Sequence, residues 1–253
     1  MSKGLMRTCF ILNIVVLLSL ECQSGELPSD IVKCTVGDND CVRDKIMEVF
    51  QKYPKGNPKF GLPNISALTL NDVTIAQVKG NAPITLNFKF LKMTVYNMEK
   101  SIILNTTGWS REPKIIETYS FVDFVKIVGD YESEGKALLF TLNGKGKGVV
   151  ELSNCTTHTK WRLDFEQRSD GKKYIKVSKL KAVMTPQKMV IKLDNLVKGS
   201  KELTDSLNSA LNENWMDFWN ELSDGIGNSI TQIFTNVLSS VFNELSYDDF
   251  FST

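Results

Sequence analysis

The sequence is short of the residues from which metal sites and many active sites are built. One histidine, His158, occurs among 253 residues, together with five cysteines. A structural zinc site needs about four Cys or His ligands at characteristic spacings, and the sequence offers no such set. We therefore expect no metal and no cofactor.

Charge of one sign and long apolar runs are also missing. The 30 Lys and Arg residues are nearly balanced by 29 Asp and Glu residues. A nucleic-acid partner would favour a basic face, so none is expected. A membrane span needs roughly 20 consecutive apolar residues, and the apolar run at 9–18 is shorter. Stable membrane insertion is therefore not expected either.

The first 24 residues have the pattern of a secretory signal peptide. Lys3 and Arg7 precede the apolar run at 9–18, and small and polar residues follow near position 24. A basic start, a short apolar stretch and a small-residue exit are typical of a cleaved signal. We expect residues 1–24 to be removed and residues 25–253 to form a single secreted, extracellular domain.

Three cysteines remain once such a signal is removed. Cys34 and Cys41 lie close together, and in an oxidising compartment a close pair is normally a disulfide. A metal loop would need further ligands, and a redox dithiol favours the shorter Cys-x-x-Cys spacing. The expected Cys34–Cys41 disulfide would hold a short amphipathic helix at 42–50. Cys155 is left either buried and free or paired between chains as a Cys155-linked dimer.

Asn-x-Ser/Thr sequons occur three times, as is common in secreted proteins. They make Asn64, Asn105 and Asn154 candidates for N-glycosylation. A glycan on Asn154 would place the adjacent Cys155 near the surface.

From about residue 65 to residue 195 the hydrophobic pattern is that of β-strands. Alternation is clearest at 161–166, which leads through a turn signal at 169–171 into a second strand. At 68–75 and 84–95 the alternation changes phase, as it does at a β-bulge. We therefore expect long, strongly curved antiparallel strands.

The last fifty residues return to a helical period. Apolar residues spaced by fours and threes run from Leu203 to Val241, roughly 60 Å of helix at about 1.5 Å per residue. Gly225 and Gly227 are expected to kink this helix. Residues 225–243 carry no charge, which suits neither a membrane span nor a surface helix but fits enclosure by a bent sheet. The predicted fold is α+β: one domain in which a highly curved antiparallel β-sheet wraps a long C-terminal α-helix and leaves an elongated apolar interior.

Four features in this order resemble the takeout and haemolymph juvenile-hormone-binding protein family of insects. They are the pair Cys34 and Cys41, Gly-Asp-Tyr at 129–131, Ile-Lys-Leu-Asp-Asn-Leu-Val-Lys-Gly at 191–199, and Leu-Asn-Glu-Asn-Trp at 211–215. The resemblance implies the α/β-wrap fold of tubular lipid-binding proteins, carriage of a small hydrophobic ligand and, at family level, a link to biological rhythms. Hormone-binding members resemble each other in having a second disulfide. Without one, this chain is more similar to the takeout branch.

The leading hypothesis is a secreted carrier that binds a lipid-like ligand, such as a terpenoid or a fatty acid, in an internal tunnel. The candidate lining residues lie on the apolar side of the C-terminal helix, with one tyrosine whose phenol offers a polar contact: Tyr131, Trp215, Phe218, Trp219, Ile226, Ile230 and Phe234. Aromatic stripes also fill ordinary cores. The resemblance, and not the periodicity, favours a cavity.

Two other hypotheses stay open. A secreted interaction or signalling factor would act through a receptor, or through a dimer, without a stable ligand. An esterase would need a nucleophile, a base and an orienting acid, but the sequence has no Gly-x-Ser-x-Gly elbow. Its one usual base, His158, lies three residues from Cys155, which on a strand places the two side chains on opposite faces. We therefore expect no catalytic residues.

Overall fold

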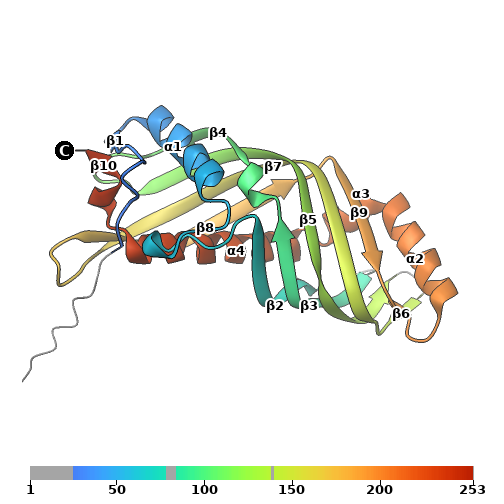
Figure 1. Cartoon of the computed structure of the whole chain (residues 1–253). Helices are drawn as coiled ribbons and strands as arrows, with labels where there is room; N and C mark the ends of the chain where they lie inside the picture. The colour runs from blue at the N-terminus through green and yellow to red at the C-terminus, as the bar shows by residue number, and fades with distance from the viewer. Residues whose placement is uncertain (1–24, 78–83, 138–139, 253) are drawn as a thin grey trace, which may run out of the picture.

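A computed structural model describes residues 25–77, 84–137 and 140–252; the expected signal peptide lies outside these residues. One strongly curved sheet arches over α4, with α1 at one end of the arch and α2 and α3 at the other (Figure 1). The helices are α1 (Asn39–Lys52), α2 (Lys201–Glu213), α3 (Trp215–Glu221) and α4 (Ser223–Glu244). The strands are β1 (Cys34–Thr35), β2 (Ala67–Gln77), β3 (Ile84–Tyr96), β4 (Ile102–Thr107), β5 (Ile115–Ala137), β6 (Phe140–Leu142), β7 (Lys145–Gln167), β8 (Lys173–Thr185), β9 (Lys188–Leu193) and β10 (Phe251–Ser252). The predicted α+β wrap is confirmed.

Two long strands, β5 and β7, form the centre of the sheet. β5 and β7 each span 23 residues and pair antiparallel from Ile115 opposite Arg162 to Glu132 opposite Lys145. The strand order is β2-β3-β5-β7-β8, with β4 and β6 also on β5 and β9 also on β7. Such long strands twist and coil, and this coiling encloses the helix. The predicted hairpin through 169–171 is the turn between β7 and β8.

The predicted changes of phase coincide with irregularities in the ladders. The register between β3 and β5 shifts between Phe90 and Lys92, so that Leu91 is the extra residue of a bulge. Gly129 lies opposite Met93, and a Cβ there would come within 2.4 Å of the Lys92 carbonyl oxygen. Glycine is therefore required where the bulged strand approaches its neighbour.

The C-terminal helix is not one continuous rod, and this part of the prediction is wrong. The breaks fall at Asn214 and Leu222, whereas Gly225 and Gly227 lie inside α4. Helical backbone hydrogen bonds still continue on both sides of each break residue. The N–H of Asn214 donates to Ala210 (3.1 Å) and its carbonyl accepts from Phe218 (3.1 Å). The N–H of Leu222 donates to Phe218 (3.2 Å) and its carbonyl accepts from Ile226 (3.0 Å). Because helical bonding continues on both sides of each bend, the apolar spacing cannot reveal it.

The N-terminal segment is held by the predicted disulfide. The sulfur atoms of Cys34 and Cys41 are 2.00 Å apart, and the carboxylate of Asp38 caps α1 by accepting from the backbone N–H of Cys41 at 2.9 Å. Cys34 also pairs in parallel with Phe251, so β1 joins the two ends of the described chain.

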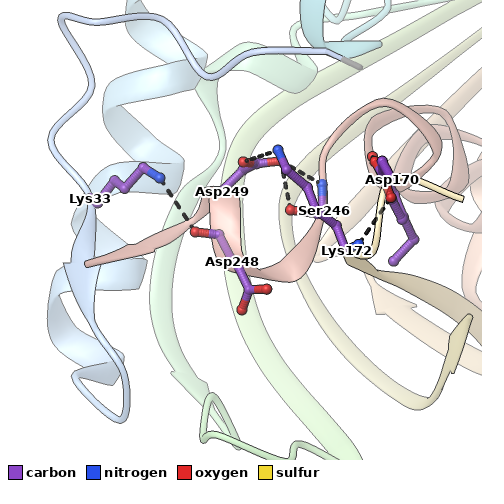
Figure 2. A network of polar contacts seen from close by, with 7 residues as sticks. Lys33, Asp170, Lys172, Ser246, Asp248 and Asp249 are labelled. Atoms are coloured by element: carbon purple, nitrogen blue, oxygen red, sulfur yellow. Dashed lines mark hydrogen bonds and ion pairs between the residues drawn. The ribbon is translucent and has the colours of Figure 1, made fainter. Parts of the chain in front are cut away.

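Polar contacts hold the C-terminal segment beside β1 (Figure 2). Asp249 accepts hydrogen bonds from the backbone N–H and hydroxyl of Ser246 at 2.9 and 2.7 Å, and its other oxygen is 3.1 Å from the Lys172 ammonium. Lys33 donates to the carbonyl of Asp248 at 3.3 Å. The last described residues are therefore an ordered part of the domain.

Candidate ligand cavity

An apolar cavity of about 160 Å³ lies between the concave face of the sheet and α4. Residues of β2, β3, β5, β7, β8, β9, α3 and α4 contribute to its wall, and none of the described wall residues is charged. The wall on α4 extends from Ile226 to Phe234, roughly 12 Å at about 1.5 Å per residue. The cavity is elongated and suits a chain-like apolar molecule.

Five of the seven residues proposed from the sequence lie on this wall: Phe218, Trp219, Ile226, Ile230 and Phe234. They project from α3 and α4, whose opposite side presents an exposed stripe of Asn228, Gln232, Asn236 and Ser240. Trp215 does not line the cavity. It packs against the core near the bend between α2 and α3.

Tyr131 does not line the cavity either. Its ring is fully buried and stacks on Phe88 with 5.0 Å between centroids. Its hydroxyl donates to the backbone carbonyl of Asp194 at 2.9 Å, and burial raises the pKa of the phenol. The polar contact expected for a ligand is therefore made within the protein, where it ties β5 to the end of β9.

Methionines form a part of the wall that sequence reasoning missed. Met93, Met98, Met184 and Met189, half of the eight methionines of the chain, line the cavity. Unbranched thioether side chains adapt to irregular shapes, so this wall can accommodate more than one ligand shape. Met93, Met184 and Met189 lie on strands, and strand alternation could have placed them inside.

Amide side chains of α2 hold the edge of β9, two of whose residues contribute to the cavity wall with Met189. Asn212 accepts from the backbone N–H of Ile191 at 2.7 Å and donates to its carbonyl at 2.8 Å. One turn earlier, Asn208 makes the same two contacts with Leu193, both at 2.9 Å. The two asparagines thereby satisfy the edge of β9 as a neighbouring strand would. Asn212 belongs to the Asn-x-Asn-Trp motif, whereas no sequence signal marked Asn208.

The side chains considered for chemistry lie away from one another. Cys155 is buried, fully shielded and free, and burial raises the pKa of its thiol to about 11. This placement agrees with the buried, free alternative and not with the surface position that a glycan on Asn154 would imply. His158 stacks on Tyr119 with 4.3 Å between centroids, and its Nε2 is 3.3 Å from a Glu117 oxygen. Across the described ranges, no cluster of His, Cys, Asp and Glu could hold a metal ion.

The asparagines of all three sequons are exposed: Asn64, Asn105 on β4 and Asn154 on β7. Their glycosylation stays a prediction. The amide of Asn154 donates to Gln187 at 3.2 Å. The Asn64 side chain accepts from the backbone N–H of Ser66 at 3.1 Å within a turn.

A single curved antiparallel sheet that encloses a long bent helix, with an uncharged cavity between them, defines a tubular α/β-wrap protein. The model of the family described as haemolymph juvenile hormone binding protein (JHBP) matches residues 11–252, and the chain belongs to this family. None of the helices in the described ranges is both long and apolar enough to cross a membrane.

Curated relatives and a solved structure agree with this family. The chain is 23% identical to the circadian clock-controlled protein daywake of Drosophila yakuba over 234 residues, covering 90% of this chain and 89% of that protein. The Drosophila melanogaster daywake gives the same identity and coverage. The crystal structure of Epiphyas postvittana Takeout 1 superposes with a TM-score of 0.73 at 19% identity, over 87% of this chain and 99% of that one. This last likeness shows a shared fold.

Proposed function

We propose that the protein is a secreted carrier that binds a small hydrophobic ligand in the cavity between the sheet and α4. The observation that supports this most is the elongated cavity with no charged residue on its described wall. An apolar ligand leaves water on entering such a site, which contributes roughly 25 cal/mol for each Å² of buried apolar surface. The family name makes a juvenile-hormone-like terpenoid one candidate ligand, and a fatty-acid derivative is another.

Secretion is part of the proposal. The signal pattern at 1–24 and the Cys34–Cys41 disulfide support an oxidising, extracellular compartment. Expression of the full chain in insect cells should release it into the medium, and N-terminal sequencing should begin near Gly25. Retention of the intact N-terminus inside the cell would contradict this part.

The proposal favours binding over catalysis. His158 neighbours a cavity-lining residue, Thr157, and therefore projects to the other face of β7. The buried thiol of Cys155, with its raised pKa, is a poor nucleophile. These placements give no support to an esterase built on the two side chains. An interaction or signalling role remains compatible with a carrier, since a receptor could recognise the loaded protein.

The direct test is to extract protein secreted by insect cells with organic solvent and to identify bound compounds by mass spectrometry. A second assay titrates the purified protein with diphenylhexatriene, a hydrocarbon that fluoresces in apolar surroundings. We expect a co-purified apolar compound and saturable binding of the probe. An empty extract together with no probe binding would refute the proposal.

A cavity-filling variant locates the binding. Ile230→Trp places a larger side chain in the cavity and should strongly reduce diphenylhexatriene binding. Gln232→Trp, two residues away on the exposed stripe of α4, adds the same indole outside and is the matched control. If both variants bound the probe like the unmodified protein, the ligand site would lie elsewhere.

A further inference from the structure

One part of the largely apolar cavity wall carries three hydroxyl groups; a fourth hydroxyl of the described wall belongs to Ser229 of α4. Ser120 of β5 and Thr157 of β7 are cross-strand partners, and both line the cavity. Ser101 lines it as well, two residues before Ile103, which lies opposite Ser120. We refer to Ser101, Ser120 and Thr157 as the hydroxyl site.

Hydroxyls close to this site already have partners within the protein. Thr106 and Thr118 are joined at 2.9 Å, and Trp109 donates its indole N–H to Thr106 at 2.9 Å. Thr159 reaches the carbonyl of Thr118 at 3.5 Å. On α4, Ser229 donates to the carbonyl of Gly225 at 3.0 Å. Each of these groups therefore has at least one hydrogen-bond partner within the protein.

The hydroxyl site differs in this respect. Within residues 25–77, 84–137 and 140–252, none of its three hydroxyls has a hydrogen-bond partner. The one fully enclosed side-chain oxygen or nitrogen without a partner in these ranges belongs to Glu99, so each of the three hydroxyl oxygens keeps some accessible surface. A polar group beside apolar surface is costly unless it is hydrogen-bonded. A ligand oxygen at this site would supply the missing partner.

Charge restricts the kind of oxygen that fits. The described cavity wall holds no Lys, Arg or His that could neutralise an anion, and an ionised carboxylate is costly to bury without a counter-ion. A hydroxyl can donate to a carbonyl oxygen and can accept from an alcohol. The site therefore suits an uncharged ester, ketone or alcohol better than a fatty-acid anion.

We propose that the hydroxyl site selects ligands with an uncharged oxygen-bearing head group, which lies against Ser101, Ser120 and Thr157. The apolar chain of the ligand then extends along α4 toward the β9 end of the cavity. This inference rests on the proposed carrier function and adds to it an orientation and a ligand class.

The test compares displacement of diphenylhexatriene by methyl dodecanoate, dodecan-1-ol and dodecanoate at pH 8. The unmodified protein should bind the ester and the alcohol more tightly than the anion. The double variant Ser120→Ala/Thr157→Val keeps the shape of the wall and removes two hydroxyls. Its affinity for the ester should fall by about threefold to tenfold, as the loss of hydrogen bonds to a neutral group predicts.

Two internal controls keep the result interpretable. Affinity for diphenylhexatriene, which has no polar atom, should be unchanged in the double variant and reports that the cavity is intact. Thr185→Val removes a threonine hydroxyl from an exposed position of β8, next to the wall residue Met184, and should leave the affinity for the ester unchanged.

The outcomes separate this inference from the carrier proposal. If the unmodified protein binds neither the probe nor any competitor, the carrier function fails and the inference fails with it. If the probe binds but the anion binds as tightly as the ester, or the double variant retains full affinity for the ester, the inference alone is overturned. Selective loss of affinity for the ester and the alcohol, with probe binding intact, supports it.

Discussion

Replacing the Asn212 amide by a carboxylate tests how α2 is held against β9. In Asn212 the amide accepts from the N–H of Ile191 and donates to its carbonyl, at 2.7 and 2.8 Å. Asn212→Asp keeps the size and the acceptor of the side chain but removes the donor. At neutral pH it also brings a negatively charged oxygen against the Ile191 carbonyl.

The expected loss of stability follows from these two contacts. One hydrogen bond is lost, and a partly buried carbonyl is left facing an anion, which together cost about 2 to 3 kcal/mol. In a domain of this size each kcal/mol lowers the melting temperature by roughly 2–4 °C, so the expected decrease is about 4–12 °C at pH 7. Because β9 still pairs with β7 on its other side, the strand would fray only from the end held by Asn212.

The stability of the Asn212→Asp variant should depend on pH in a definite direction. A protonated carboxyl has an O–H that can donate to the Ile191 carbonyl, so folding favours the protonated form and raises the pKa of Asp at position 212 above its usual value of about 3.9. The folded variant then binds more protons than the unfolded chain. The difference in the free energy of unfolding between the variant and the unmodified protein should therefore shrink as the pH falls through the raised pKa.

The assay is thermal unfolding followed by circular dichroism at several pH values between about 4 and 8. Asn228→Asp, on the exposed stripe of α4, makes the same chemical change at a side chain that, within the described ranges, is hydrogen-bonded to no strand. It should change the melting temperature little at any pH. The reasoning is refuted if Asn212→Asp has the same melting temperature as the control variant at pH 7. It is also refuted if the difference in melting temperature from the unmodified protein does not change with pH.

Further predictions concern the disulfide, the free thiol and the C-terminal network. Replacing Cys34 and Cys41 together by serine should lower the free energy of unfolding by about 2 to 3 kcal/mol in denaturant titrations, from the loop entropy of the unfolded chain. Cys155 should resist iodoacetamide at pH 8 until urea unfolds the protein, because burial raises the pKa of its thiol to about 11. Burial raises the pKa of Asp249, but hydrogen bonds from Ser246 outweigh it and the pKa is lowered. The stability advantage over Asp249→Asn should therefore be full above about pH 4 and decline as the pH falls below it.

Sequence periodicity was sufficient for the fold because it reports local geometry. Alternation in β7 and the spacing by fours in α4 follow from which face each residue presents, and the phase change at Leu91 follows from a bulge. The bends at Asn214 and Leu222 were not predictable, since helical hydrogen bonds continue on both sides of them and leave the period intact.

The site was less predictable because its contacts join segments far apart in the chain. The phenol of Tyr131 looked available for a ligand, and only the fold brings the Asp194 carbonyl to it. The hydroxyls of Ser120 and Thr157 carry no signal in the sequence. They become a site because the register of β5 and β7 makes them neighbours.

The arrangement separates the residues that hold the protein together from those that meet a ligand. At the β9 end, Asn208, Asn212 and Tyr131 use their polar groups on backbone atoms. In a core cluster outside the cavity wall, Trp161 stacks on Phe242 with 5.5 Å between centroids. The cavity wall itself is apolar and rich in methionine. Substitutions at these packing and hydrogen-bonding contacts should therefore change stability before affinity, whereas substitutions on the wall should change which ligand is bound while the fold persists.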